Sequence, residues 1–428
     1  MKIKWLECII TFTMLLCLLS GCGSDKSSST TEAKTEKVPV SFENMMSEWK
    51  KDNNETSTTC WYTDMADQGW LALKAKDFEK EYGIKVDLVY YDGAQLFEDI
   101  NQANQKQSGP DVYIMGNDRL EFAVTGGIVS ENIAFDEAFW NDNYPTVAKS
   151  ALNYRGRQYG YPIYFDTYCL VYDSKLLETA PASIDDILAF LDEYEDTGST
   201  KAVFRWDVAD SYINSMFIAS YANIFGENGD DLTAFSVNGE QEVRAMQYFQ
   251  SLSEYLWMDK TNISHDTVMN RIKEGTLVIG LCKSDILPIL YEMKEDKEAE
   301  TDYKVGYVPS LTSELSSTCY STTYGAFINP YGNNTSAGNM FALYLSYEDQ
   351  ARQYLGNGKL PVINQKYHFD EMQTIIYAQY QNSKPVPKTM LLGDYLTESA
   401  IAYDAIWKGA DAKEELDKLQ SVMENRIQ

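Results

Sequence analysis

The chain alternates between strand-like and helix-like segments from residue 58 to residue 115, and this alternation limits the folds open to it. Apolar residues alternate in the strand at 84–91, at Ile84, Val86, Leu88 and Tyr90, and they recur with helical spacing in the helices. The predicted elements are a strand at 58–61, a helix at 69–82, a strand at 84–91, a helix from Leu96 and a strand at 111–115. This order predicts a parallel sheet with helices on its faces, whose ligands bind at the carboxyl ends of the strands.

The same mixture of elements continues to the end of the chain. Further strands are predicted at 169–172, 277–282 and 325–329, and further helices at 184–194, 337–347 and 413–427. The apolar positions of these helices fall on one side at helical spacing. The fold class is therefore predicted to be α/β.

A secretory signal is predicted at the N-terminus. Lys2 and Lys4 precede an apolar run from Ile9 to Leu19 that is too short to cross a bilayer. The run ends in Leu-Ser-Gly-Cys22, which resembles the lipobox of bacterial lipoproteins. That resemblance implies cleavage before Cys22 and a lipid on its thiol, whereas an ordinary secretory signal is the alternative. The residues that follow are rich in Ser, Thr, Lys and Glu, a composition typical of a disordered linker.

Composition excludes several classes of function. The chain has 428 residues, 44% of them hydrophobic, and a formal net charge of −28. This charge argues against nucleic acid or anionic lipid as a partner of the folded part. No second apolar stretch is long enough to cross a membrane. The folded part is expected to be a soluble monomer of two or three domains.

Cysteine and histidine usage argues against the commonest catalytic and metal sites. The body has four scattered cysteines, without the spacing of a metal site, so buried thiols or at most one bridge are expected. Cys282 and Cys319 are the better candidates for such a bridge. His265 and His368 are the two histidines, which makes His-based catalysis and His-rich metal sites improbable. We expect no metal and no cofactor.

Five segments resemble the extracellular solute-binding proteins of ABC importers, in the sugar-binding group (family 1) that includes maltose-binding protein. They occur in the order found in that group and span nearly all of the chain after the signal. The segments are GPDVYI at 109–114 with GGIV at 126–129, YRGRQYGYP at 154–162 with LVYD at 170–173, KEGTLVIG at 273–280, GKLPV at 358–362 and WKG at 407–409.

The resemblance implies a two-lobe periplasmic-binding-protein-like fold (type II). Each lobe would be a mixed, mostly parallel sheet flanked by helices, and short crossing strands would form a hinge beside an interlobe cleft. The expected parts are a signal peptide at 1–21, a lipid-anchored linker at 22–38, lobe 1 at 39–162 plus 309–347 and lobe 2 at 163–308 plus 348–428.

The resemblance also implies a function. The protein would lie on the extracellular face of the cell membrane, capture a carbohydrate by lobe closure and deliver it to an ABC transporter permease. It would not be an enzyme. The alternatives are a binding protein for a peptide, polyamine or other polar solute, a surface glycan-adhesion module, and a glycosidase that uses paired carboxylates such as Asp118 and Asp166.

Candidate ligand contacts follow the predicted strands. Asn117, Asp118 and Arg119 come after the strand at 111–115, where the resembling group places an Asp-Arg pair on sugar hydroxyls. Asp accepts and Arg donates several directed hydrogen bonds, which suits a polyol. A capped helix N-terminus is the structural alternative.

Further candidates lie in the middle of the chain. Tyr164 and Asp166 lie just past Pro162, where Asp166 takes the place of a sugar-binding Glu, although a solvated strand end would have the same residues. A second loop, with Trp206, Asp210 and Tyr212, resembles the binding loop of the second lobe. Aromatic faces stack on sugars, yet most aromatic side chains belong to a core. The remaining candidates are Thr63, Asp64 and Trp70 after the first strand, and Tyr320 and Tyr324 before the strand at 325–329.

Some positions depart from the group. Where maltose-binding protein stacks tryptophans on its sugar, this chain has Met115, Lys283 and either Tyr395 or Leu396. This difference favours a carbohydrate other than maltodextrin. Lys283 has a charge that suits a carboxylate or phosphate on the ligand, and a solvated lysine is the alternative.

Overall fold

The computed structural model describes residues 40–51, 54–195, 201–258, 261–296, 299–347, 357–364 and 369–428. Val40–Gln428 form one compact unit. The predicted signal peptide, the linker and the lipidation residue Cys22 lie outside the described residues. Within the described ranges, no helix is both long enough and apolar enough to cross a membrane.

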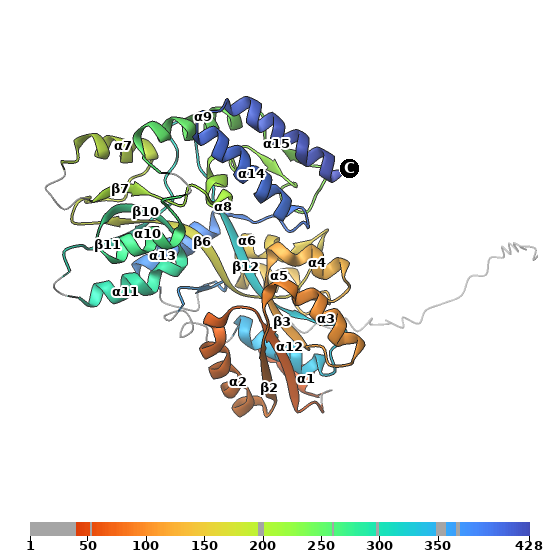
Figure 1. Cartoon of the computed structure of the whole chain (residues 1–428). Helices are drawn as coiled ribbons and strands as arrows, with labels where there is room; N and C mark the ends of the chain where they lie inside the picture. The colour runs from red at the N-terminus through yellow and green to blue at the C-terminus, as the bar shows by residue number, and fades with distance from the viewer. Residues whose placement is uncertain are drawn as a thin grey trace, which may run out of the picture. The chain divides into compact units, whose positions relative to one another are not determined.

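The predicted strand and helix order at the start of the folded unit is confirmed. Strands β1 (Ser57–Tyr62), β2 (Lys85–Tyr90) and β3 (Val112–Gly116) are parallel, with β1 in the centre. Helices α2 (Gln68–Tyr82) and α3 (Leu96–Gln105) connect them. Helix α2 ends at Gly83, whose φ of +73° is the left-handed conformation that glycine adopts readily. We call the half of the molecule around these strands the first lobe (Figure 1).

Two long strands connect this lobe to the rest. Strand β6 (Tyr161–Asp173) has 13 residues and β12 (Tyr320–Ile328) has 9, so both are longer than the short crossing strands expected. The first half of β6 pairs with β12, which itself pairs with β3, and all of these pairs are antiparallel. Figure 1 shows β6 and β12 running from the first lobe into the second.

The second half of β6 enters the second lobe, the part around β7 (Ala202–Arg205), β10 (Leu277–Lys283) and β11 (Tyr303–Gly306). Strands β10 and β11 pair with β6 in antiparallel fashion, whereas β10 and β7 are parallel. The sheet is thus mixed, as predicted. The antiparallel pairs of its main sheet all involve β6 or β12.

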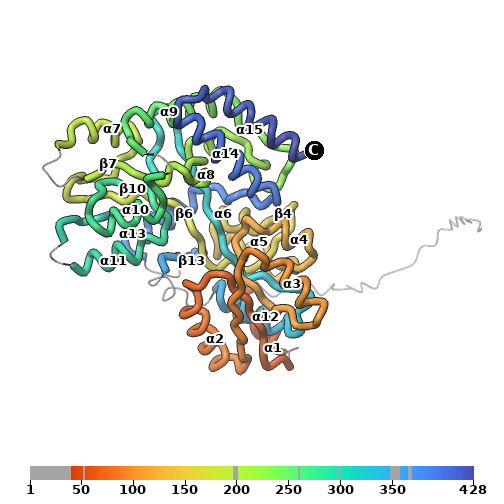
Figure 2. Tube along the Cα trace, in the orientation of Figure 1, coloured from red at the N-terminus to blue at the C-terminus, as the bar shows by residue number. Residues whose placement is uncertain are grey.

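Helices cover both halves of the sheet. Helices α14 (Leu392–Trp407) and α15 (Ala412–Ile427) pack beside α9 (Glu240–Tyr255), although they are far from it in the sequence (Figure 2). The other helices are α1 (Phe42–Lys51), α4 (Leu120–Thr125), α5 (Glu137–Asn143), α6 (Thr146–Ala151), α7 (Ile184–Glu193), α8 (Ser211–Asn214), α10 (His265–Lys273), α11 (Leu287–Glu295), α12 (Thr335–Tyr347) and α13 (Glu371–Gln381).

Short elements complete the two lobes. The short strands are β4 (Asn153–Tyr154), β5 (Arg157–Gln158), β8 (Asn223–Ile224), β9 (Phe235–Ser236), β13 (Leu360–Pro361) and β14 (Lys384–Pro385). The 3₁₀ turns are η1 (Met65–Asp67), η2 (Gly93–Gln95), η3 (Asn117–Arg119), η4 (Ser215–Phe217) and η5 (Ser284–Ile286). Four of these turns, η1, η2, η3 and η5, follow the carboxyl ends of β1, β2, β3 and β10.

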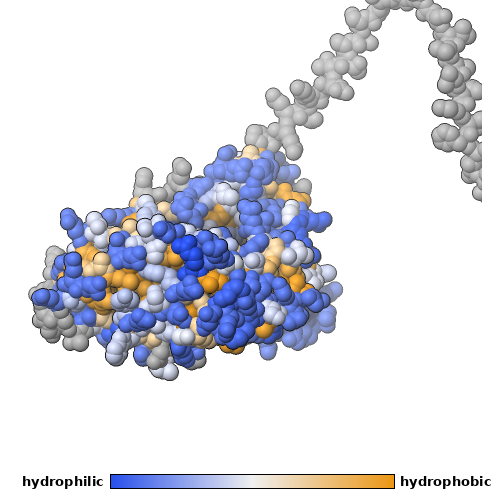
Figure 3. Space-filling view, turned by 90° about the horizontal axis from the view of Figure 1, so that it is seen from above, coloured by the Kyte–Doolittle hydropathy of each residue, from blue (hydrophilic) through white to orange (hydrophobic). Residues whose placement is uncertain are grey.

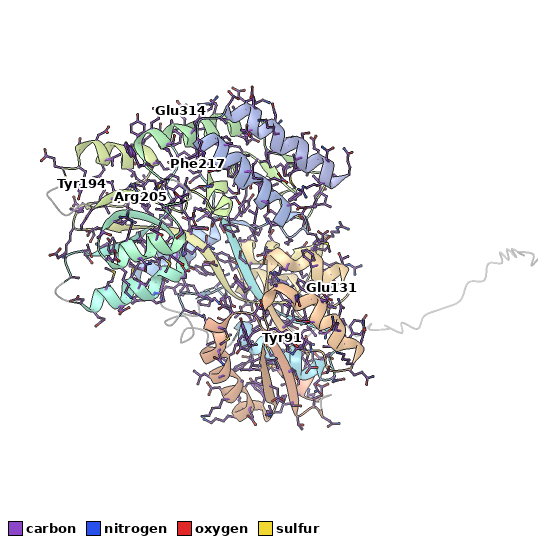
Figure 4. All side chains as sticks on the ribbon, in the orientation of Figure 1. Tyr91, Glu131, Tyr194, Arg205, Phe217 and Glu314 are labelled. Atoms are coloured by element: carbon purple, nitrogen blue, oxygen red, sulfur yellow. The ribbon has the colours of Figure 1, made fainter. Side chains whose placement is uncertain are left out.

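Aromatic side chains make up much of the core. Trp61 and Tyr91 stack in the first lobe with ring centroids 3.8 Å apart, and Phe217 packs near Trp206 in the second lobe; Figure 4 labels Tyr91 and Phe217. The surface seen in Figure 3 is largely hydrophilic, with hydrophobic residues gathered in a few separate areas. A folded unit of this size buries a large apolar area, which is the main stabilising term.

The four cysteines of the folded unit are buried free thiols. The expectation of buried thiols is confirmed, but the proposed pairing of Cys282 with Cys319 is wrong. Cys282 instead lies opposite Cys169 in the β10–β6 ladder, because antiparallel register places those two residues side by side.

Candidate functional site

Alternate residues of β6 and β12 form a polar and aromatic face where the strands cross. Successive side chains of a strand point to opposite sides, so Tyr164, Asp166 and Tyr168 share one face of β6. Thr322 and Tyr324 lie opposite Asp166 and Tyr164 in the ladder. The rings of Tyr164 and Tyr324 are 4.9 Å apart.

Asp166 lies at the centre of this face. Its carboxylate is half-buried and accepts a hydrogen bond from Ser284 Oγ at 3.1 Å. Burial raises the pKa of Asp166, against the opposing charge of Lys283. A carboxylate in this setting has remaining capacity to accept hydrogen bonds from a ligand.

Lys283 ends strand β10 beside two tyrosines. Its Nζ lies 5.7 Å from the ring centroid of Tyr168 and 5.9 Å from that of Tyr212. Both distances fall in the range of cation–π contacts. The predicted residue Lys283 is thus a half-buried cation near Asp166, rather than a fully solvated side chain.

Asp210 joins the second-lobe loop to this face. Its Oδ1 accepts a hydrogen bond from Tyr212 N at 2.8 Å and thereby caps α8, while its Oδ2 accepts one from Tyr168 Oη at 2.9 Å. Tyr212 Oη lies 3.2 Å from Thr322 Oγ1 on β12. Asp210 therefore positions two tyrosines, and both of its oxygens already have a protein partner.

The first lobe contributes the carboxylates of Asp64, the N-cap of η1, and of Asp67, its last residue, and Lys359 binds both. Lys359 Nζ donates to Asp64 and, at 2.9 Å, to Asp67, whose side chain is 1% exposed. Burial favours a higher pKa for Asp64, but the hydrogen bond and charge of Lys359 lower it below its usual value. Burial raises the pKa of Asp67 despite the same lysine, and Tyr164 Oη also donates to Asp67.

The three predicted residues of η3, Asn117, Asp118 and Arg119, have different roles. Asn117 is fully buried, donates to Val386 O at 2.9 Å and accepts from Thr323 N at 2.8 Å, so it is a structural residue. Asp118 and Arg119 are half-buried, and Arg119 Nη1 donates to Gly93 O. Burial raises the pKa of Asp118, against the charge of Arg119.

Asp118 and Arg119 line a cavity of about 350 Å³. Its other lining residues come from η2, α3, α4, the residues just before α14 and the start of α14: Ala94, Phe97, Phe122, Thr389, Met390, Leu392, Gly393 and Leu396. The cavity therefore lies between residues of the first lobe and the C-terminal helices that pack on the second lobe.

The predicted residues of both lobes surround Tyr324. Burial raises the pKa of Tyr324, and the charges of four carboxylates add to the effect. In order of their contribution, these carboxylates belong to Asp166, Asp118, Asp64 and Asp67. The structure thus brings Asp64, Asp118, Asp166 and Tyr324 together, with Tyr164, Arg119, Asp210, Tyr212 and Lys283 next to them.

Other predicted residues lie elsewhere. Trp206 is fully buried in the core of the second lobe, where its Nε1 donates to Asn214 Oδ1 at 2.9 Å. Trp70 is buried in α2, and Thr63 lies beside Gly93. Tyr320 lines a separate cavity of about 500 Å³ between α6, residues 222–229 and residues 381–387.

The residues that stand where the resembling group has sugar-stacking tryptophans do not all lie in the same part of the structure. Met115 and Tyr395 are buried in the core, whereas Leu396 lines the cavity beside Asp118. Leu396, rather than Tyr395, is therefore the residue of that pair that reaches the cleft.

Sequence reasoning missed Lys359, Tyr168, Thr322 and Asp67. Tyr168 could have been predicted, because it lies on the same strand at an even spacing from Tyr164 and Asp166, so its side chain points to the same face. Lys359 belongs to the GKLPV segment, which carried the resemblance but no predicted contact. Among the described residues, no group of three or more His, Cys, Asp or Glu side chains is arranged to hold a metal ion.

Two lobes joined by crossing strands, with a polar and aromatic face at the crossing, define the class of two-lobe binding proteins. Residues 74–375 match the family described as bacterial extracellular solute-binding protein, and the chain belongs to this family.

Similar proteins agree with this assignment. The maltooligosaccharide ABC transporter solute-binding lipoprotein of Streptococcus pneumoniae (strain ATCC BAA-255 / R6) is 23% identical over 94% of this chain and 92% of its own length. Maltodextrin-binding protein MdxE of Bacillus subtilis (strain 168) is 22% identical over 83% of this chain and 86% of its own.

Solved structures share the fold. A cyclo/maltodextrin-binding protein complexed with maltotetraose superposes with a TM-score of 0.75 and 20% identity, covering 88% of this chain and 98% of that one. An extracellular solute-binding protein from Staphylococcus aureus in complex with maltose also gives a TM-score of 0.75, with 19% identity and the same coverage. The predicted two-lobe fold is thereby confirmed.

Proposed function

We propose that the protein captures a carbohydrate by closing its two lobes and delivers it to an ABC transporter permease. The observation that carries this proposal is the face of β6 and β12, where Asp166, Tyr164 and Tyr324 meet side chains of both lobes. Carboxylates accept hydrogen bonds from hydroxyl groups, and aromatic rings stack on apolar faces, so the combination suits a sugar. The names of the relatives, which refer to maltooligosaccharide and maltodextrin, support the same class of ligand.

Both lobes would contact the ligand. Lobe 1, at 39–162 plus 309–347, would contribute Asp118 and Arg119, and lobe 2, at 163–308 plus 348–428, would contribute Lys283 and Tyr212. Asp166 lies on the strand that crosses between them. Contacts made from both sides stabilise the closed arrangement, which the permease would recognise.

The protein would work as a monomer anchored to the extracellular face of the cell membrane through a lipid on Cys22. The Leu-Ser-Gly-Cys sequence supports this anchor, and the relative from Streptococcus pneumoniae is named a lipoprotein. The family consists of binding proteins, and the proposal includes no catalytic step.

A polyamine is the second candidate ligand, because carboxylates outnumber cations around Tyr324. Four carboxylates, those of Asp64, Asp67, Asp118 and Asp166, influence its pKa, against three nearby cations. Lys359 pairs with Asp64 and Asp67, Arg119 lies beside Asp118, and Lys283 lies near Asp166. A ligand with several ammonium groups would complement this excess of negative charge.

A thermal-shift screen tests the proposal. Residues 22–428 with Cys22→Ser would be melted with mono- and oligosaccharides, spermidine and short peptides, because a ligand that binds the folded state raises its melting temperature. We expect stabilisation by a saccharide that chromatography recovers unchanged. Stabilisation by spermidine alone would support the second candidate, and conversion of the saccharide would indicate an enzyme.

A further inference from the structure

Two of the buried cysteines lie side by side in the sheet of the second lobe. Cys169 of β6 and Cys282 of β10 are directly opposite each other in the antiparallel ladder between these strands. Directly opposite residues point to the same face of a sheet, and neighbours along one strand point to opposite faces. Both thiols therefore lie on the face away from Tyr168 and the cleft, although they are far apart in the sequence.

The spacing of such a pair suits a disulfide. Directly opposite residues of an antiparallel ladder have Cα atoms about 4.5–5.5 Å apart, within the range of about 4.4–6.8 Å found in disulfides. Their Cβ atoms must approach each other by up to about 1 Å for the bond to form. Only the pair of Lys283 and Tyr168 follows the cysteines before this ladder ends. Few hydrogen bonds therefore oppose a small shift of the two strands at this point.

A third cysteine lies on the other side of β6. Strand β12 pairs with β6 through Ser321 opposite Thr167, and Cys319 directly precedes β12. Continuing this register by two residues places Cys319 beside Cys169, because β6 lies between β12 and β10. Three of the four cysteines of the folded unit thus gather in one row, whereas Cys60 lies in β1 of the first lobe.

The location of the protein favours a disulfide over thiols. The chain belongs to a family of bacterial extracellular proteins. Disulfides form and persist outside the cell, whereas the reducing cytosol keeps most thiols free. A pair of cysteines in direct cross-strand register has therefore both the geometry and the surroundings in which such a bond forms.

We propose that Cys169 and Cys282 form a disulfide as the chain folds outside the cell, and that this bond fixes β6 to β10. One S–S bond forms and two S–H bonds break. The two electrons and two protons pass to an extracellular protein or small-molecule disulfide, which is reduced to two thiols. The structure describes the reduced form, in which both thiols are free.

The bond forms before the sheet is complete. Both side chains are fully buried in the folded protein, so an oxidant has no access to them there. Burial also raises the pKa of both thiols, which leaves little of the reactive thiolate. The folded, reduced protein should therefore resist oxidation, whereas the folding chain should not.

The bond acts on a strand that runs between the lobes. The first half of β6 pairs with β12, and its second half pairs with β10. A covalent link to β10 keeps the second half in the second lobe, so bending during closure is confined to the part that pairs with β12. The disulfide also raises the melting temperature, because it restricts the unfolded chain.

Thiol counting in protein from two compartments tests this proposal. Residues 22–428 with Cys22→Ser keep the four cysteines of the folded unit, and would be produced by secretion through an oxidising compartment and also in a reducing cytosol. After unfolding in urea, we expect two thiols in the secreted protein and four in the cytosolic protein. Peptide mapping by mass spectrometry should find Cys169 joined to Cys282, and the secreted protein should melt at the higher temperature.

A second route gives the same answer without secretion. Oxidised glutathione should form no bond in the folded cytosolic protein, but should form the bond when present during refolding from urea. Cys60→Ala and Cys319→Ala are the matched controls, and each should keep the bond with one thiol left. Cys282→Ala should melt at the same temperature from both compartments.

Every other pairing contradicts the proposal. Four thiols in the secreted protein and after oxidative refolding would overturn it, and so would a bond between Cys169 and Cys319. Neither result affects the proposed function, because neither thiol faces the cleft and ligand binding needs no disulfide. Titration calorimetry of both forms with a saccharide tests that function separately.

Discussion

Lys359 is the single residue on which the first-lobe side of the cleft most depends. Its ammonium group binds Asp64 and Asp67 and lies 4.5 Å from the ring centroid of Tyr164. Next to it, the backbone of Gly358 packs so closely on Asp285 that a Cβ would approach Asp285 Cα to 2.6 Å. Lys359 therefore connects η1 of the first lobe to η5 of the second.

Lys359→Met should destabilise the protein by about 3 kcal/mol, because it leaves the buried Asp67 carboxylate without its cation. Urea unfolding of the variant measures this loss. The double variant Lys359→Met with Asp67→Asn should recover most of it, since no buried charge then remains. As a control, Lys408→Met removes an exposed pair with Asp404 and should cost about 0.5 kcal/mol or less. Equal losses in both single variants would contradict the assigned role of Lys359.

Lys388 gives the stability of the protein a pH dependence of unusual sign. It is fully buried, and desolvation lowers its pKa to about 8, against the charge of Asp230. Between that value and its ordinary pKa near 10.4, the unfolded chain binds more protons than the folded one. Lys388 therefore lowers the free energy of unfolding below about pH 8. This loss disappears as the pH rises from about 8 to about 10.4.

The difference between the unmodified protein and Lys388→Met isolates this contribution. We expect the free energy of unfolding of the unmodified protein, relative to the variant, to rise by on the order of 3 kcal/mol between pH 7.5 and pH 10.5. Denaturant unfolding at several pH values gives the curve. If the difference in free energy of unfolding between the two proteins does not change with pH, Lys388 keeps its ordinary pKa.

Among the secondary-structure elements, α8 and β6 together position the second-lobe tyrosines. Asp210 caps α8 through Tyr212 N and accepts from Tyr168 Oη of β6. Asp210→Ala should cost about 2 kcal/mol, because it removes a helix cap and leaves a buried hydroxyl without its acceptor. Ligand affinity should fall as well, since both rings flank Lys283.

Asp210→Asn is the matched variant for this prediction. The amide oxygen can still accept from Tyr212 N, but the amide nitrogen cannot accept from Tyr168 Oη. The cap is therefore kept and the acceptor lost, so stability should fall by about 1 kcal/mol. Thermal unfolding and titration calorimetry distinguish the two variants. If Asp210→Asn destabilises the protein as much as Asp210→Ala, the acceptor for Tyr168 Oη rather than the cap is what stabilises this region.

The elements differed in how far they could be predicted from the sequence. The order at 57–116 could be predicted because the strand at 84–91 alternates, α2 ends at Gly83, and Gly109-Pro110 separates α3 from β3. The full length of β6 was not, because Pro162 and Asp166 interrupt its apolar pattern. The first half of β12 has the polar sequence Tyr-Ser-Thr-Thr, and only pairing with β6 shows that it is a strand.

The site was predicted in part, for a similar physical reason. Asp118, Asp166 and Lys283 follow or lie on strands that sequence patterns identified, so topology placed them near one another. Lys359 and Thr389 come from irregular segments far along the chain, and no spacing rule brings them to Asp67 or Asp118. Trp206 shows the opposite error, because an aromatic ring in a loop can equally fill a core.

In the molecule as a whole, strands β6 and β12 run between the lobes. Among the described residues, a third segment, 386–391, hydrogen-bonds to both lobes, through Glu121 N to Lys388 O and through Lys388 N to Gly229 O. In this third segment, Val386 N also donates to Ser321 O. A few connecting segments can change their backbone angles while the cores on either side stay packed, which is the requirement for hinge closure.

Binding of a saccharide should therefore make the protein more compact. Small-angle X-ray scattering of residues 22–428 with Cys22→Ser should give a lower radius of gyration with a saturating saccharide than without it, because ligand contacts from both lobes favour the closed arrangement. Asp166→Asn should bind about tenfold to a hundredfold more weakly, through loss of a charged hydrogen-bond acceptor at the crossing. At the same saccharide concentration, it should retain the larger radius. Tight binding without compaction would instead indicate a rigid module that holds glycans at the surface, and would remove the reason for a permease to distinguish the loaded protein from the empty one.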